Sequence, residues 1–101
     1  MRFVTFHPQA AAEAVEAMEY YEARSQGLGS EFLSEIERSL DQVVANPELY
    51  EAIGRRARRK PLWPFPYRLV YAVYPDRIRV VAVAHYKRRP YYWRRRMQGA
   101  G

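Results

Sequence analysis

The first half of the chain has the hydrophobic pattern of two amphipathic helices. In residues 8–25 the apolar side chains at helical spacing are Ala11, Ala14, Val15, Met18 and Tyr21. A second stripe, in residues 32–44, consists of Phe32, Leu33, Ile36, Leu40, Val43 and Val44. Apolar groups that recur every three or four residues form one buried face of a helix. The spacing therefore predicts two helices, and the glutamates that fall outside the first stripe are Glu13, Glu16, Glu19 and Glu22.

Glycine and proline residues mark the ends of these helices. Pro8 suits a first helical turn, where its missing N–H needs no partner, and His7 before it is expected to act only as a weak cap. Gly27 is a candidate for a left-handed backbone position between the helices. Asn46-Pro47 ends the second helix, since proline disfavours helical backbone in the residue before it. Because the connection is short, we expect an antiparallel helical hairpin.

Short runs rich in β-branched and aromatic residues predict strands elsewhere. Residues 2–6 indicate a short strand, and residues 67–74 and 78–85 indicate two longer ones, joined by a turn at Pro75-Asp76. Residues 58–62 indicate a further strand, which the nearby prolines would confine to a sheet edge or cut short. The resulting order, β-α-α-β-β-β, predicts an α+β fold in which the helical hairpin packs on a mainly antiparallel sheet.

The length of the turn fixes the register of the two long strands. A two- or four-residue connection places one row from each strand on the same side of the sheet, and we expect this side to face the helices. That row is Tyr67, Leu69, Tyr71, Val73, Ile78, Val80, Ala82 and Ala84. The opposite row is then Arg68, Val70, Ala72, Arg79, Val81, Val83 and His85.

The composition fits one small folded domain. The chain has 101 residues, 49% of them hydrophobic, so we expect a single domain over residues 1–101, with a tail that frays from about residue 97. Cysteine is absent from the sequence, which excludes disulfides and thiolate metal sites, and no cofactor or metal is expected. Because no apolar run is long enough to cross a bilayer and no signal peptide is apparent, we expect a cytoplasmic protein with no membrane partner.

Charge divides the chain into two unlike halves. Residues 1–54 hold three arginines and ten acidic residues, a net charge of −7. Residues 55–101 hold fourteen basic residues and one aspartate, a net charge of +13. Such asymmetry indicates a polyanionic or acidic macromolecule as partner of the basic half, whereas a solvated basic face is the alternative.

Several short motifs, in this order, resemble the RelE/ParE superfamily of toxins. The helical hairpin of that superfamily is similar to Tyr20-Tyr21-Glu22, Gly27-Leu28-Gly29 and Glu31-Phe32-Leu33, and Asn46-Pro47 to the end of its second helix. Residues 65–71 resemble its central strand, and residues 83–93 resemble the closing segment of its ParE-like members. The resemblance covers nearly the whole chain.

This resemblance implies the toxin of a type II toxin–antitoxin system, neutralised by a cognate antitoxin that wraps over it. RelE-like toxins cut mRNA in the ribosome without a metal, whereas ParE-like toxins poison DNA gyrase. The closing segment favours gyrase as target and growth arrest by binding. A ribosome-dependent mRNA endonuclease is the second hypothesis, and a non-toxic module that binds RNA or protein is the third.

Nuclease chemistry would need a phosphate clamp and groups that move protons. Some ribosome-dependent nucleases of the superfamily use an arginine in the central strand and a His-Tyr pair at its close, and Arg68, His85 and Tyr86 match that order. Arg68 would clamp the phosphate, His85 would act as base or acid, and Tyr86 would assist. The alternative for His85 is a strand-end histidine bound to backbone. Those nucleases end soon after the pair, whereas fifteen residues follow Tyr86 here.

Two basic and aromatic stretches are candidates for binding a target or a nucleic acid. They supply Arg56, Arg58, Arg59, Lys60, Arg88, Arg89, Tyr91, Tyr92 and Trp93. The first stretch is suited to phosphates or to an acidic antitoxin, or it is a charged edge strand that resists aggregation. The aromatics of the second are suited to stacking on bases or anchoring a protein interface, or, Trp93 above all, to folding back over the core.

Overall fold

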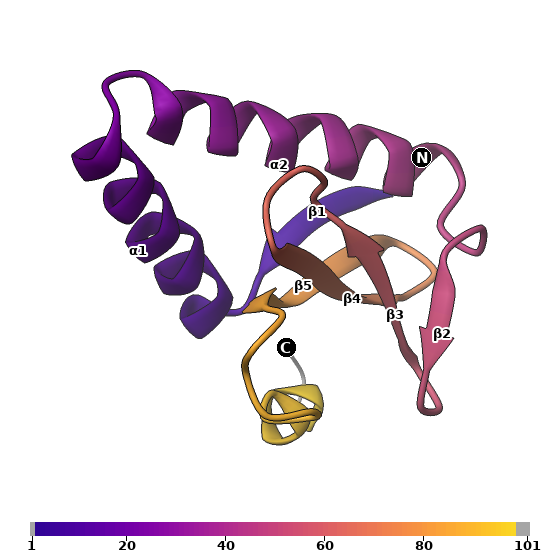
Figure 1. Cartoon of the computed structure of the whole chain (residues 1–101). Coiled ribbons are helices and arrows are strands. Elements are labelled where there is room, and N and C mark those ends of the chain that lie inside the picture. The colour runs from indigo at the N-terminus through magenta and orange to yellow at the C-terminus, as the bar shows by residue number, and fades with distance from the viewer. Residues whose placement is uncertain (1, 99–101) are drawn as a thin grey trace.

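The computed structural model describes residues 2–98 and places two helices on one face of a five-stranded sheet (Figure 1). The elements are β1 (Phe3–Phe6), α1 (Pro8–Arg24), α2 (Leu28–Ala45), β2 (Glu51–Ile53), β3 (Ala57–Pro61), β4 (Tyr67–Val73), β5 (Arg77–His85) and a 3-10 turn, η1 (Arg94–Met97). Residues 86–98, the C-terminal segment, cross the sheet face that lies away from the helices. The predicted α+β architecture is confirmed.

The predicted helix ends are close to those observed. His7 caps α1, because its Nδ1 accepts a hydrogen bond from the Gln9 backbone N–H at 3.0 Å. Gly27 has a φ of 87°, as the predicted left-handed position requires, and α2 ends at Ala45, directly before Asn46. Gly29 lies where the helices meet, and a Cβ on it would come within 2.7 Å of the Met18 carbonyl oxygen. Neither helix is long and apolar enough to span a membrane within the described residues.

The sheet contains one strand more than the sequence predicted. The strand order is β1-β5-β4-β3-β2, and every neighbouring pair is antiparallel except β1 and β5. Glu51–Ile53 forms β2, which is too short to show any alternation, and it pairs with β3. Two effects of the nearby prolines were predicted for the strand near residues 58–62: the edge position is wrong, because β2 covers β3, whereas the strand does end at Pro61.

A β-bulge overturns part of the predicted register. Val73 lies opposite Ile78, as a turn with an even number of residues requires, but Tyr71 pairs with Val80 while Val70 pairs with Ala82. Val81 is thus the extra residue, and beyond it the faces of β5 are exchanged. Val83 and His85 therefore lie on the helix side, whereas Ala82 and Ala84 lie on the opposite side, the reverse of the prediction.

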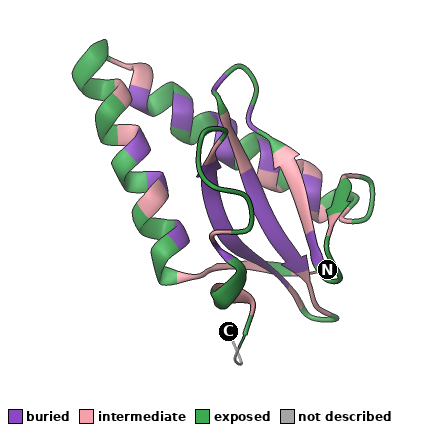
Figure 2. Cartoon of the chain, turned by 60° about the horizontal axis from the view of Figure 1, so that its bottom comes forward, coloured by how far each residue is buried: buried purple, intermediate pink, exposed green. Residues whose placement is uncertain are grey.

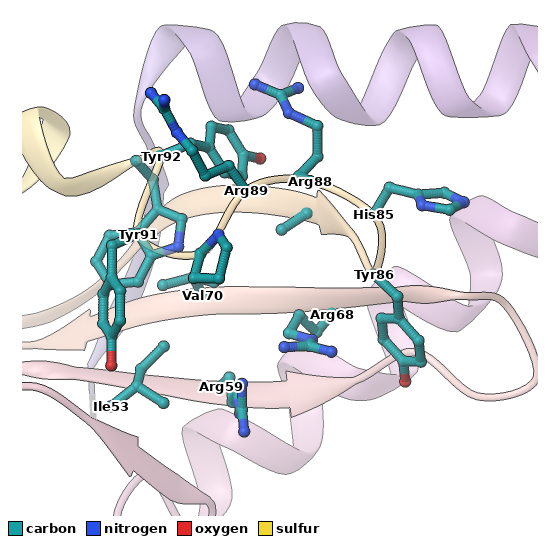
Figure 3. Close-up of a pocket in the computed structure, with 13 residues that line it drawn as sticks. Ile53, Arg59, Arg68, Val70, His85, Tyr86, Arg88, Arg89, Tyr91 and Tyr92 are labelled. Atoms are coloured by element: carbon teal, nitrogen blue, oxygen red, sulfur yellow. The ribbon is translucent and has the colours of Figure 1, made fainter.

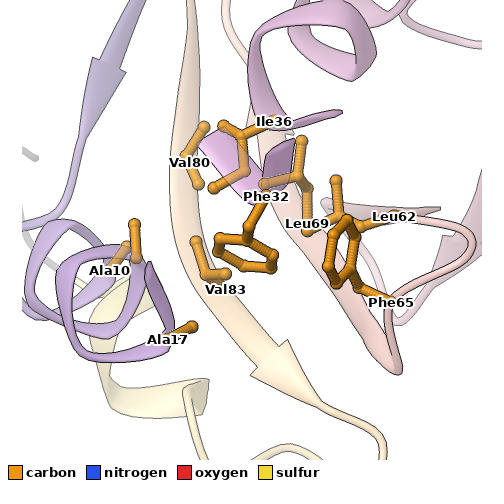
Figure 4. Close-up of a cluster of buried hydrophobic side chains, with 10 residues drawn as sticks. Ala10, Ala17, Phe32, Ile36, Leu62, Phe65, Leu69, Val80 and Val83 are labelled. Atoms are coloured by element: carbon orange, nitrogen blue, oxygen red, sulfur yellow. The ribbon is translucent and has the colours of Figure 1, made fainter. Parts of the chain in front are cut away.

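The helix-facing core is formed by aromatic and aliphatic side chains from every layer (Figure 4). Phe32 of α2 is fully buried, and its ring lies 5.1 Å from Phe65 and 5.3 Å from Tyr67. Along α1 the buried positions are Ala10, Ala14 and Ala17. The predicted stripe through Ala11 and Val15 is therefore shifted, because both are exposed. A run of alanines does not define the phase of a helix.

A second cluster covers the other face of the sheet. Trp93 of the C-terminal segment is only 6% exposed and packs with Val70, Val81 and Ala82. Both faces of β4 and β5 are consequently buried (Figure 2). Met97 belongs to η1 and packs against this cluster, whereas residues 99–101 of the predicted frayed tail lie outside the described part of the chain.

The aromatic cluster around Phe32 predicts that substitutions at neighbouring positions of α2 differ greatly in their effect on the free energy of unfolding. Phe32→Ala should lower the free energy of unfolding by about 3–5 kcal/mol, because it leaves a cavity in the core. Leu33→Ala, at a position 38% exposed, is the matched control and should cost much less. Urea unfolding followed by circular dichroism measures both, and equal losses would contradict the assigned phase of α2.

The His7 cap predicts a pH dependence of stability. Burial, followed by the charges of Arg79 and Arg96, lowers the pKa of His7 below 6.5 in the folded chain, where its neutral Nδ1 accepts a hydrogen bond. The unfolded chain binds the proton more readily, so stability present above pH 6.5 is lost as the pH falls towards the folded pKa. Unfolding of His7→Asn, which keeps a capping acceptor, should show a smaller loss across this pH range; an identical profile would contradict the assignment.

Candidate functional site

A basic pocket of about 220 Å³ opens between the sheet and the C-terminal segment (Figure 3). Arg59 of β3 and Arg68 of β4 form one side of it, with Ile53 of β2 nearby. The C-terminal segment supplies the other side with Tyr86, Arg88, Arg89, Pro90, Tyr91, Tyr92 and Trp93. The pocket therefore exists only while that segment lies on the sheet.

Strand alternation places Arg59 and Arg68 on the same side of the sheet. Arg59 lies opposite Val70, and Arg68 lies opposite Ala84, both of which belong to the cluster on the face away from the helices. The Arg68 guanidinium lies 4.4 Å from the centre of the Tyr86 ring, and Arg59 Nε donates to Glu51 Oε1 at 2.8 Å. That hydrogen bond, with the charge of Arg59, lowers the pKa of Glu51. Two permanent cations thus line this side of the pocket.

His85 points away from Arg68 (Figure 3). Its ring packs edge-on against Tyr67, with the ring centres 4.9 Å apart, on the helix side of the sheet. Its Nδ1 accepts a hydrogen bond from the Lys87 backbone N–H at 3.0 Å. Because the bulge at Val81 exchanges the faces, the His85 imidazole lies on the helix side; His85 and Arg68 both line the pocket, but only the Tyr86 ring lies against the Arg68 guanidinium.

The other candidate cations are divided between two sides of the sheet. Arg58 donates to the carbonyl oxygens of Glu48 and Tyr50, and Lys60 lies near Ser39 of α2, so both are on the helix side. Arg56 lines a second hollow beside the pocket. Arg88 and Arg89 project on the opposite side of the pocket from Arg59 and Arg68 (Figure 3). The structure thus separates Arg58 and Lys60 from the pocket.

The three consecutive aromatics of the C-terminal segment have different surroundings. Trp93 is buried in the second cluster, which agrees with the alternative that it folds back over the core. Tyr92 is partly buried with the Arg88 guanidinium 3.8 Å from its ring centre. Tyr91 is 51% exposed, and its φ of 60° makes it the one non-glycine residue with positive φ among residues 2–98. A bulky residue in this region is strained, a feature common where a side chain must be presented to a ligand.

The sequence analysis missed Glu13, which holds the C-terminal segment in place. Its carboxylate accepts from the Val83 backbone N–H at 3.0 Å, from Tyr92 Oη at 2.8 Å, and from both terminal nitrogens of Arg96 at 2.9 and 3.0 Å. The side chains of Glu13 and Arg96 are only 12% and 11% exposed. Burial and the hydrogen bond to Glu13 raise the pKa of Tyr92. We call Glu13, Tyr92 and Arg96 the clasp.

The clasp takes the place of a missing strand along β5. The β1 pairing ends where Phe6 lies opposite Val80, so the next backbone groups of β5 have no strand beside them on that edge. Glu13 accepts from the Val83 N–H, and Arg96 Nη1 donates to the Val81 carbonyl oxygen at 3.1 Å. Glu13 lies one residue before the buried Ala14, but the exposed Glu16 stands in the same way before the buried Ala17, so the sequence alone does not single out Glu13.

Removing Glu13 should destabilise the protein and loosen the C-terminal segment. Glu13→Ala leaves Arg96 largely buried without its partner, so we expect a loss of about 3 kcal/mol in the free energy of unfolding. Glu16→Ala, at an exposed position on the same helix, is the control and should change it by less than about 0.5 kcal/mol. Urea unfolding and Trp93 fluorescence measure the two effects, and equal stabilities would contradict the role of the clasp.

Comparisons with solved structures support the fold described above. A structure of the chromosomal ParDE toxin–antitoxin system from P. aeruginosa is similar over 84% of this chain and 96% of that chain, with a TM-score of 0.62 and 18% identity. A YoeB dimer from Staphylococcus aureus is similar over 83% of this chain and 95% of that chain, with a TM-score of 0.60 and 20% identity. No curated protein matched the chain.

A match to a family model shows the family of the chain, which similarity of fold alone does not. The model of the ParE toxin of the type II toxin–antitoxin system parDE matches residues 4–90, a range that includes both helices, the five strands except Phe3 of β1, and the first part of the C-terminal segment. The chain therefore belongs to the ParE toxin family and is the toxin component of a type II toxin–antitoxin system.

Proposed function

We propose that this toxin arrests growth by binding its target, that the target is DNA gyrase, and that the basic pocket makes the contact. One observation carries the choice of binding over cleavage: Arg59 and Arg68 lie together in the pocket, whereas the imidazole of His85 packs against Tyr67 on the helix side. ParE-like members of the superfamily, which the closing segment resembles, poison gyrase. The cognate antitoxin that the family implies counteracts this activity.

The groups that could act as a base in the pocket are poorly placed or weakened. RNA cleavage needs a base whose pKa lies near the working pH and which reaches the attacking hydroxyl. His85 faces Tyr67 and uses its Nδ1 to accept from Lys87. Glu51 is held by Arg59, which lowers the pKa of the carboxyl and makes it a weaker base. The Tyr86 ring is held against the Arg68 guanidinium, 4.4 Å from the ring centre, in a cation–π contact.

The same groups are well suited to binding. Arginine forks form paired hydrogen bonds with carboxylates and phosphates, and arginine and tyrosine are enriched where interfaces gain most of their affinity. Arg68, Tyr86 and Tyr91 present these groups from three separate positions around one hollow. Trp93, which is buried, would support the contact surface from below and not touch the target itself.

Supercoiling by purified gyrase tests this proposal. The toxin should inhibit the reaction, and Arg68→Ala should raise the concentration needed by about tenfold or more, since hydrogen bonds to charged groups contribute about 1.5–3 kcal/mol. Arg24→Ala, on the exposed side of α1, should inhibit like the wild type. Circular dichroism would verify that both variants are folded.

Cleavage of ribosome-bound mRNA is the competing outcome. Unimpaired supercoiling, together with codon-positioned cuts that disappear in Arg68→Ala, would contradict the proposal and establish a nuclease. Inhibition of gyrase that is equal for wild type and Arg68→Ala would retain the target but remove the pocket from the contact.

A further inference from the structure

An exposed tryptophan lies in the connection between β3 and β4, residues 62–66. Trp63 is 74% exposed, more than any other large hydrophobic residue among residues 2–98, whereas Trp93, the other tryptophan of the chain, is 6% exposed. A single apolar side chain in contact with water is common on protein surfaces. The significance of Trp63 therefore depends on how rigidly it is held and on what surrounds it.

The connection holds Trp63 in a fixed position. Leu62 is fully buried and Phe65 is 9% exposed, and both belong to the helix-facing core. The Leu62 N–H donates to the Tyr67 carbonyl oxygen at 2.9 Å, and the Phe65 N–H donates to the Leu62 carbonyl oxygen at 2.9 Å. Two prolines among the five residues restrict the backbone further. A side chain presented by an ordered backbone loses little conformational entropy when it binds a partner.

The surroundings of Trp63 are apolar and uncharged. Residues 61–67 contain no charged side chain, although the chain from residue 55 onwards has a net charge of +13. Lys60, directly before this stretch, is turned to the helix side, where its Nζ donates to Ser39 Oγ and to the Pro61 carbonyl oxygen. Sites that stack nucleic acid bases on aromatic rings place cations beside those rings. An apolar cleft in a protein therefore suits Trp63 better than a nucleic acid strand.

The connection adjoins the basic pocket. At its base, Pro61 pairs with Arg68, which lines the pocket. The Pro66 carbonyl oxygen accepts a hydrogen bond at 2.9 Å from the backbone N–H of Tyr86, a pocket residue that is 43% exposed. Trp63, Arg68 and Tyr86 thus belong to one end of the sheet, and tryptophan, arginine and tyrosine are the residue types that contribute most to protein interfaces.

We propose that Trp63 is a further contact residue for the target and inserts into an apolar cleft of the target protein, while Arg68 pairs with a carboxylate beside that cleft. A covered tryptophan buries about 150–250 Å², so this one side chain would supply much of the apolar contact that the polar pocket lacks. The inference rests on the proposed function, because it takes gyrase as the protein that offers the cleft.

Binding of toxin variants to purified gyrase measures the contribution of Trp63. Trp63→Ala should bind at least about tenfold more weakly than the wild type, as truncation of a buried interface tryptophan does. Phe3→Ala is the matched control, because Phe3 is an aromatic residue 59% exposed that lies opposite Arg77, at the other end of β5. The control should bind within about twofold of the wild type. Circular dichroism would verify that both variants are folded.

The outcomes separate this inference from the proposed function. Equal affinities of the wild type and Trp63→Ala, with weaker binding by Arg68→Ala, would overturn the role of Trp63 and retain gyrase as target. A wild type that does not bind gyrase would overturn both. A change in the sedimentation of the toxin alone on substitution of Trp63 would assign this residue to a contact between two copies of the chain and overturn the inference as well.

Trp63→Arg distinguishes a protein cleft from a nucleic acid. An unpaired guanidinium is costly to bury in an apolar cleft, so this variant should bind gyrase as weakly as Trp63→Ala does. A nucleic acid partner would accept the added cation, and wild-type affinity of Trp63→Arg for gyrase bound to DNA would overturn the inference.

Fluorescence quenching locates the contact in the unaltered chain. In toxin labelled with 5-hydroxytryptophan, which can be excited apart from the tryptophans of gyrase, acrylamide should quench Trp63 strongly and the buried Trp93 weakly. Added gyrase should shield Trp63 from acrylamide. Quenching that stays unchanged when gyrase is bound would overturn the inference.

Discussion

The structure depends on one largely buried carboxylate. Glu13 satisfies a backbone N–H on the uncovered edge of β5 and, at the same time, binds Tyr92 and Arg96 of the C-terminal segment. A buried charge is tolerated only when it is paired and hydrogen-bonded, and here every partner comes from another part of the chain. The acidic half and the basic half of the sequence meet in this contact. Without it, the C-terminal segment, which forms one side of the basic pocket, would lose these hydrogen bonds and keep the packing of Trp93.

Much of the fold could be predicted from local patterns. Gly27, Asn46-Pro47 and the even-numbered turn before Ile78 each act through the backbone of one or two residues, so the sequence displays them directly. The parts that could not be predicted depend on contacts between distant segments or on positions where the hydrophobic pattern is ambiguous. The bulge at Val81 follows from pairing with β4, and the phase of α1 is hidden by a run of alanines.

The candidate site was only partly visible in the sequence, for the same reason. Arg68, Tyr86 and the basic C-terminal segment were identifiable from composition and order. The bulge, which the residues themselves do not reveal, turns the His85 imidazole to the helix side, away from the Arg68 guanidinium. Glu13 is 83 residues from Arg96, so no local motif joins them. A contact of that separation follows only from the completed fold.

The charge asymmetry of the sequence acquires a physical meaning in the structure. Part of the positive charge stabilises the protein, through Arg96 in the clasp and Arg58 on the helix side. Other arginines line two adjoining hollows, which share Tyr91 and Trp93.

The exchange rate of the Val83 amide hydrogen tests the central claim most directly. If its N–H donates to the Glu13 carboxylate under a closed clasp, the hydrogen should exchange as slowly as those of the paired interior strands, through global unfolding. Rapid exchange at Val83, with slow exchange retained at Val80 and Leu69, would show that the clasp is open in solution and would contradict the account.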